Sequence, residues 1–128
     1  MIVRNWGALR VVLAVLVLSL CAGPIIASSA SASTVGQRNA LSSAESYLSS
    51  MAFSRSGLIH QLEFEGYSGS QSRWAVRHVR FSWRYQAYKS AKSYLRSMSF
   101  SRSGLIDQLE FEGFTHYQAR YGVWRAYR

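Results

Sequence analysis

The chain has 128 residues, with 15 Lys or Arg against six Asp or Glu, and its formal net charge is +9. This length allows one globular domain or two very small modules. The single cysteine cannot form an internal disulfide, and no four-ligand Cys/His zinc spacing is present. These counts exclude a disulfide scaffold, a structural zinc module and a large two-domain enzyme. They favour a small basic protein that binds a partner.

The N-terminal segment, residues 1–32, has the pattern of a secretory signal peptide. Two arginines precede an apolar run at residues 11–20, and small residues follow it. Gly23 and Pro24 interrupt the apolar stretch, so it is marginal as a membrane-spanning helix, although an uncleaved anchor stays open. We therefore expect the chain to be exported, either to the outer face of the cell membrane or as a secreted protein.

Two processing reactions compete for this segment. A general signal peptidase would cleave after Ala32 and leave Ser33 at the N-terminus of a chain without cysteine. The alternative is lipidation of Cys21, which follows a lipobox-like segment. This lipobox is weak, because the preceding Leu20 is bulky and the residues after Cys21 are apolar. Both reactions stay open at this point.

The rest of the chain is a tandem duplication. Residues 44–66 align without gaps with residues 91–113, and 19 of these 23 positions are identical. We therefore expect two repeats, at residues 37–80 and 84–128. Each unit is too short to bury much apolar surface, so we expect the two to pack on each other through their first helices and through aromatic side chains. The aromatic candidates are Trp74, Trp83 and Trp124.

Each repeat is predicted to form three short helices. In the first helix, apolar residues at spacings of three, four and three form one stripe, which consists of Leu41, Ala44, Leu48 and Met51. The second repeat has apolar or aromatic residues at the same four positions. The predicted fold class is therefore all-α, with tandem three-helix repeats that resemble a helix-turn-helix.

Capping residues define the ends of the second and third helices of each repeat. Ser54 is the expected N-cap of a helix that Gly66 ends by entering the left-handed region. Capping boxes then begin the third helices, at Ser68–Gln71 in the first repeat and at Thr115–Gln118 in the second.

Charge is distributed unevenly along the chain. Residues 73–102 contain eight Lys or Arg and no acidic residue. The basic band singled out there consists of Arg73, Arg77, Arg80 and Arg84. Such a band suits phosphate, anionic lipid or an acidic partner, although a solvated surface explains it equally well. The acidic residues gather instead in a Leu-Glu-Phe-Glu segment in each repeat. The candidate interaction surface comprises these acids and one arginine of each repeat: Glu63, Glu65, Glu110, Glu112, Arg55 and Arg102.

The sequence contains no recognisable catalytic constellation. His60 is replaced by Asp107 in the second repeat, so the repeats share neither a base nor a metal ligand there. His78 and His116 have no cysteine or repeated carboxylate at ligand spacing. The serines lie at helix caps rather than in a nucleophile elbow. We therefore expect no enzymatic activity, no metal ion and no cofactor.

The duplicated string Tyr-Leu-x-Ser-Met-x-Phe-Ser-Arg-Ser-Gly-Leu-Ile-x-Gln-Leu-Glu-Phe-Glu-Gly-(Tyr/Phe) occupies residues 47–67 and 94–114. It resembles the repeat of the host cell surface-exposed lipoprotein family, called Ltp. The resemblance implies a tandem helix-turn-helix-like module at the outer face of the cell membrane. In temperate-phage members it implies superinfection exclusion, in which DNA injection by incoming phages is blocked. It implies no catalytic residues.

This chain departs from the family pattern in two places. The lipobox is weak, and the third helices and the linker are basic where relatives are more acidic. If an acidic face holds the phage component, the Leu-Glu-Phe-Glu segments are what remains of it here.

Three binding functions are consistent with these features. The first is contact with a protein, either a phage injection component or another envelope protein, which blocks phage DNA entry. The second is contact with an anionic membrane or the cell wall through the Arg, Trp and Tyr residues at 80–85. The third is nucleic-acid binding through Gln71, Arg73 and Arg77 on a recognition-like helix, which the signal peptide opposes.

Overall fold

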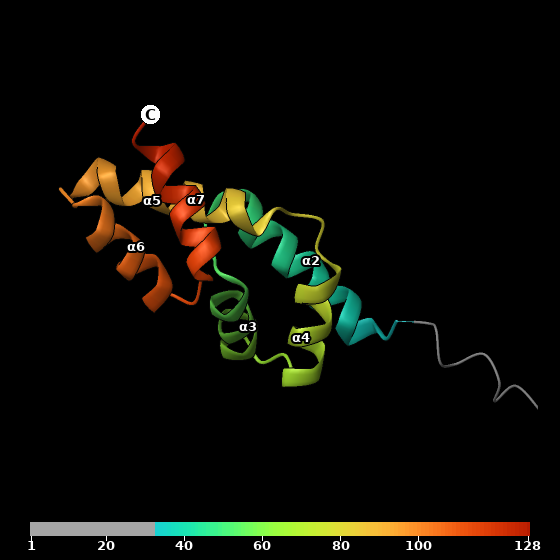
Figure 1. Cartoon of the computed structure of the whole chain (residues 1–128). Helices are drawn as coiled ribbons and strands as arrows, with labels where there is room; N and C mark the ends of the chain where they lie inside the picture. The colour runs from blue at the N-terminus through green and yellow to red at the C-terminus, as the bar shows by residue number, and fades with distance from the viewer. Residues whose placement is uncertain (1–32) are drawn as a thin grey trace, which may run out of the picture. The chain divides into compact units, whose positions relative to one another are not determined.

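The computed structural model describes residues 33–128, and this part of the chain consists of six helices (Figure 1). The helices of the first repeat are α2 (Val35–Ser50), α3 (Arg55–Phe64) and α4 (Gly69–His78). Those of the second are α5 (Trp83–Ser97), α6 (Arg102–Phe111) and α7 (His116–Ala126). The predicted all-α fold of tandem three-helix repeats is confirmed. Cys21 and Ala32, the two processing candidates, lie outside the described residues.

Helix starts follow the predicted capping chemistry. The Ser54 hydroxyl accepts a hydrogen bond from the Gly57 N–H at 3.0 Å, and Ser101 caps α6 in the same way. Both predicted capping boxes form, since Ser68 and Thr115 each exchange two hydrogen bonds with the glutamine three residues later. A third box begins α2, where Thr34 pairs with Gln37. These caps satisfy backbone N–H groups that have no partner within the helix.

The turn between the second and third helices of each repeat depends on a glycine. Gly66 has a φ of 100° and Gly113 a φ of 98°, which is the left-handed region. In the first repeat the N–H of Tyr67 donates to the carbonyl of Leu62 at 3.2 Å, and the second repeat forms the same bond. This is a Schellman ending, which lets the third helix begin within a few residues.

Each repeat has its own small core. The fully buried side chains of the first core come from all three of its helices, and Ala40, Ala44 and Leu48 form the stripe on α2. The predicted stripe is therefore wrong at its end, because Met51 is 47% exposed and lies at the C-cap of α2. The buried residues of the second core are Ala87, Ala91, Leu105, Leu109, Phe114, Ala119 and Val123.

A close helix approach occurs in the second repeat, between α5 and α7. A Cβ atom added to Gly122 would lie 2.5 Å from the carbonyl carbon of Ala87 and 2.7 Å from the backbone nitrogen of Tyr88. The two helices therefore meet backbone to backbone at this point. The first repeat has Ala75 at the equivalent position, where a fully buried methyl group fits between α2 and α4.

Side chains of each repeat form hydrogen bonds to the backbone of the other. The ammonium of Lys89 on α5 donates to the carbonyls of Leu48 and Met51 at 2.8 and 3.1 Å, and so caps the C-terminal end of α2. The Ser54 hydroxyl donates to the backbone carbonyl of Glu112. This bond joins the start of α3 to the end of α6.

The expectation that aromatic side chains join the repeats is correct for one residue. Trp83 packs against the core of the first repeat, and its ring lies under the Arg55 guanidinium at 5.3 Å. Trp74 instead stacks on His78 of its own helix, with ring centroids 3.9 Å apart. Trp124 is half exposed. Trp74 also packs against the core of its own repeat, so it supports that repeat rather than the junction between the two.

Candidate functional site

The Leu-Glu-Phe-Glu segment ends the second helix of each repeat and presents a phenylalanine to solvent. Phe64 and Phe111 are each 87% exposed, whereas Leu62 and Leu109, two residues earlier, are fully buried. Residues two apart on a helix point in nearly opposite directions, so burying the leucine forces the phenylalanine outward. The duplication thus displays two equivalent exposed aromatic rings.

Glutamates flank each exposed ring. Glu63 lies 4.0 Å from the Arg73 guanidinium, and Glu110 lies 2.9 Å from the imidazole of His116. Both pairs are largely solvent-exposed and join the second helix of a repeat to its third. Such surface pairs stabilise a fold by about 0–1 kcal/mol, so these carboxylates can exchange partners at little cost.

The second glutamate of each segment behaves differently in the two repeats. The Glu112 carboxylate accepts hydrogen bonds from the hydroxyls of Tyr94 and Ser90 and from the amide of Gln108. The hydrogen bond to this carboxylate, together with burial and its negative charge, raises the pKa of Tyr94 above its ordinary value of 10.0. Glu65, the equivalent residue in the first repeat, is exposed.

One part of this difference follows from a single hydroxyl group. In the first repeat, Ser43 forms a hydrogen bond of 3.0 Å with the Tyr67 hydroxyl. Phe114 replaces Tyr67 in the second repeat and offers no hydroxyl. Ser90, the equivalent of Ser43, therefore donates to Glu112 instead.

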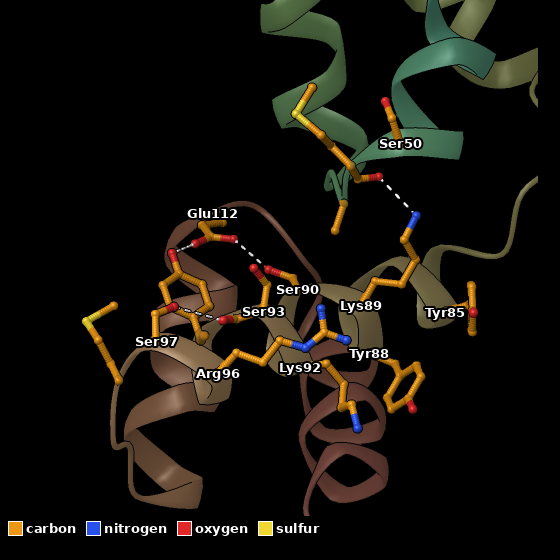
Figure 2. Close-up of a pocket in the computed structure, with 14 residues that line it drawn as sticks. Ser50, Tyr85, Tyr88, Lys89, Ser90, Lys92, Ser93, Arg96, Ser97 and Glu112 are labelled. Atoms are coloured by element: carbon orange, nitrogen blue, oxygen red, sulfur yellow. Dashed lines mark hydrogen bonds between the residues drawn. The ribbon is translucent and has the colours of Figure 1, made fainter.

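The same surface carries a hollow in each repeat. In the first repeat the hollow encloses about 300 Å³ and is lined by Ser42, Ser43, Ser46, Tyr47, Ser50 and Glu65. In the second repeat it encloses about 690 Å³ and is lined by the six equivalent residues, 47 positions later in the chain, and by several others (Figure 2). The larger volume reflects the end of α2, which supplies Met51 and Ala52 to one wall.

Three cations distinguish the hollow of the second repeat. Lys89, Lys92 and Arg96 line it, where the first repeat has two serines and Glu45. Figure 2 shows Lys89 extended toward the end of α2; Lys92 and Arg96 also extend from α5, one helical turn apart. The sequence did show this signal: two of the four differences between the aligned repeats are Lys92 and Arg96. It did not show that both face a hollow.

The predicted interaction surface is divided in space. Arg55 and Arg102 begin α3 and α6, whereas the glutamates lie at the ends of these ten-residue helices, about 15 Å away along the axis. Arg102 lies over the ring of Tyr127, 5.1 Å from its centroid. Within each repeat the glutamates therefore lie beside the phenylalanine, and the arginine begins the opposite end of the same helix. The start of α3 meets the end of α6, however, so Arg55 lies near the glutamate segment of the second repeat.

The basic band runs from α4 through the linker to α5, and its four arginines are exposed. Arg84 lies over the rings of Tyr117 and Tyr121, 5.8 and 5.0 Å from their centroids. Gln71, proposed above as a base-reading residue, accepts a hydrogen bond from the N–H of Ser68. Its amide is thus engaged in the capping box.

Two further features concern the described part of the chain alone. No helix there is long and apolar enough to span a membrane. Within residues 33–128, no group of three or more His, Cys, Asp or Glu side chains could hold a metal ion.

Comparisons with known proteins extend over both repeats. A family model described as "Host cell surface-exposed lipoprotein" matches residues 36–79 and 82–124. The solved structure of Ltp, a superinfection exclusion protein from the Streptococcus thermophilus temperate phage TP-J34, is similar with a TM-score of 0.69 and 34% sequence identity. This similarity covers 72% of the present chain and 96% of the phage protein. No protein of curated function matches the chain.

Proposed function

The chain belongs to the family of host cell surface-exposed lipoproteins, and from this membership we propose that it excludes incoming phages by blocking DNA injection at the cell surface. The family description confirms the predicted location outside the cytoplasm. The phage protein of known structure is a superinfection exclusion protein, and its similarity extends over almost its whole length. We further propose that the chain acts by binding alone, without catalysis or a cofactor.

The observation that carries a binding role is the duplicated aromatic surface, which we define as Phe64 and Phe111 with their flanking glutamates. An aromatic ring that is 87% exposed adds little to folding, yet it can bury most of its area in a partner. Exposed aromatic side chains of this kind often dominate the binding energy of an interface.

This surface indicates the chemistry of the partner. Each ring would enter an apolar pocket, and the adjacent carboxylates would meet basic or hydrogen-bond-donating groups on its rim. A protein offers both, and we propose a phage injection component, or an envelope protein needed for injection, as that partner. Two equivalent surfaces on one chain raise the apparent affinity for a repeated or extended partner.

We propose that a lipid on Cys21 holds the module at the membrane, where injection takes place. The family description supports this, because it names a lipoprotein. Mass spectrometry of the protein from the membrane fraction should find a diacylglycerol-modified Cys21 at the N-terminus. A chain that begins at Ser33 would contradict the anchor and leave a secreted module.

Superinfection exclusion has a specific cellular signature. Expression of the full chain in a phage-sensitive host should leave adsorption unchanged while phage DNA inside the cells falls at least tenfold. A Cys21→Ala variant of the chain serves as the control for surface attachment. Unchanged DNA entry in cells that display the wild-type chain would refute the exclusion role, and reduced adsorption would indicate receptor blocking instead.

A further inference from the structure

The hollow of the second repeat has the dimensions of a small-molecule site. Its volume of about 690 Å³ falls within the range of ligand pockets, roughly 300–1,000 Å³. Its lining combines hydroxyl, aromatic and charged side chains with two methionines and an alanine. The hollow of the first repeat shares six lining positions but is less than half as large. The two hollows can therefore be compared within one chain.

Two of the cations in this hollow have no acidic partner. Lys92 and Arg96 lie one turn apart on α5, and within residues 33–128 neither forms an ion pair. Like charges at this spacing repel each other along a helix, and an anion between them would relieve the repulsion. Lys89 adds positive charge beside them, although its ammonium also donates to carbonyls of α2.

The acidic residue of the hollow limits which anion can enter. The Glu112 carboxylate lines the hollow and accepts hydrogen bonds from Tyr94 and Ser90 (Figure 2). A carboxylate disfavours a second anionic group but accepts hydrogen bonds from hydroxyls. The hydroxyls of Ser93 and Ser97 line the same wall and can donate to or accept from a polyol. A suitable ligand therefore carries one anionic group for the cations and hydroxyl groups for Glu112 and the serines.

We propose that this hollow binds a polyol phosphate, of which glycerol phosphate is the simplest case. The phosphate lies against Lys92 and Arg96, and the polyol hydroxyls reach Glu112 and the serines. The first repeat lacks the site because Glu45 and Ser49 replace the two cations. Two sources of this chemistry exist outside a cell, namely the headgroup of phosphatidylglycerol and the phosphate-linked polyols of wall polymers.

The test measures binding of glycerol 3-phosphate to the full chain in mild detergent by isothermal titration calorimetry. The informative variant is Lys92→Glu with Arg96→Ser, which installs the residues of the first repeat. Arg77→Glu with Arg80→Ser makes the same charge change at exposed positions of the basic band and serves as the control. Thermal unfolding of each variant checks that the fold is retained.

We expect one site per chain, at least a tenfold loss of affinity in the Lys92/Arg96 variant and less than a twofold change in the control. Inorganic phosphate should bind at least fivefold more weakly than glycerol 3-phosphate. An equal loss in both variants would mean a general charge effect and would overturn the proposal, as would the absence of glycerol phosphate binding. Equal affinity for inorganic phosphate would overturn the role of Glu112 and the serines.

Competition experiments distinguish the two sources of ligand. If the headgroup is the ligand, vesicles of phosphatidylglycerol in phosphatidylcholine displace glycerol 3-phosphate and soluble poly(glycerol phosphate) does not. If the polymer is the ligand, the reverse holds. The inference is independent of the exclusion role. Phe64→Ala with Phe111→Ala should therefore leave the affinity for glycerol 3-phosphate unchanged.

Discussion

Gly122→Ala should destabilise the chain even though alanine is the better helix former. The added Cβ would lie 2.5 to 2.8 Å from three backbone atoms of α5, whereas carbon atoms in contact need about 3.5–4.0 Å. No side chain can rotate away, so α5 and α7 must separate by about 1 Å. Overpacking of this kind costs about 1–3 kcal/mol, and a rigid backbone neighbour places the cost at the upper end. The higher helix propensity of alanine offsets about 1 kcal/mol of this cost, so the free energy of unfolding should fall by about 2 kcal/mol.

The assay is urea unfolding followed by circular dichroism. The slope of the unfolding free energy against urea concentration should be the same for the variant and the wild type. A loss of about 2 kcal/mol corresponds to a fall in Tm of about 8–16 °C for a body of this size. Ala75→Gly is the matched control in the first repeat, where the methyl group already fits. It should also destabilise, by about 2 kcal/mol, through lost helix propensity and lost burial. A Gly122→Ala chain as stable as the wild type would refute the backbone-to-backbone approach of α5 and α7.

Three further predictions rest on other contacts. Ser54→Ala should cost about 1 kcal/mol more than Ser101→Ala, because both lose an N-cap but only Ser54 is buried and bonded to the other repeat; equal losses in urea unfolding would contradict this. Tyr94→Phe should be less stable than the wild type at pH 8. Because the pKa of Tyr94 is raised in the folded state, its hydroxyl contributes fully to stability below pH 10.0, and this contribution is lost as the pH rises through the higher folded pKa. The difference in Tm between variant and wild type should therefore narrow in that range; a constant difference would argue against the bond to Glu112. Gln86→Met should raise stability by about 1 kcal/mol, because the Gln86 amide is fully buried and makes no hydrogen bond within the described residues; a lower Tm would indicate an unseen partner for the amide.

Local features of the fold could be predicted from the sequence, because their causes are local. A serine or threonine three residues before a glutamine forms a capping box wherever it begins a helix, as Ser68 does. Gly66 ends α3 because a residue with a Cβ atom is strained at positive φ. The duplication then made it possible to predict the second repeat from the first.

Features that depend on the environment of a residue could not be predicted in this way. Ser54 and Ser101 lie in identical segments, yet only Ser54 meets the other repeat. The sequence around the two serines is identical, so only the three-dimensional arrangement distinguishes their surroundings. The apolar pattern was also misleading at Met51, since the helix ends before that residue can reach the core.

The candidate site was predicted in part. The glutamates of the two Leu-Glu-Phe-Glu segments form a visible acidic cluster in the sequence, but the exposure of the phenylalanines between them depends on which face of the helix is buried. The hollow was missed because its lining comes from three segments that are distant in sequence. Its cations were visible as differences between the repeats, without an indication of where they point.

The most direct test of the central claim removes only the two exposed rings. Phe64→Ala with Phe111→Ala should leave the fold and the amount of protein at the cell surface unchanged, since both rings are 87% exposed. Val35→Ala, which shortens another exposed apolar side chain, is the control. Phage DNA entering the cells is then measured after equal adsorption. We predict that the double variant restores entry to the level of cells without the protein, while the control still blocks it. A double variant that blocks entry as fully as the wild type would contradict the account.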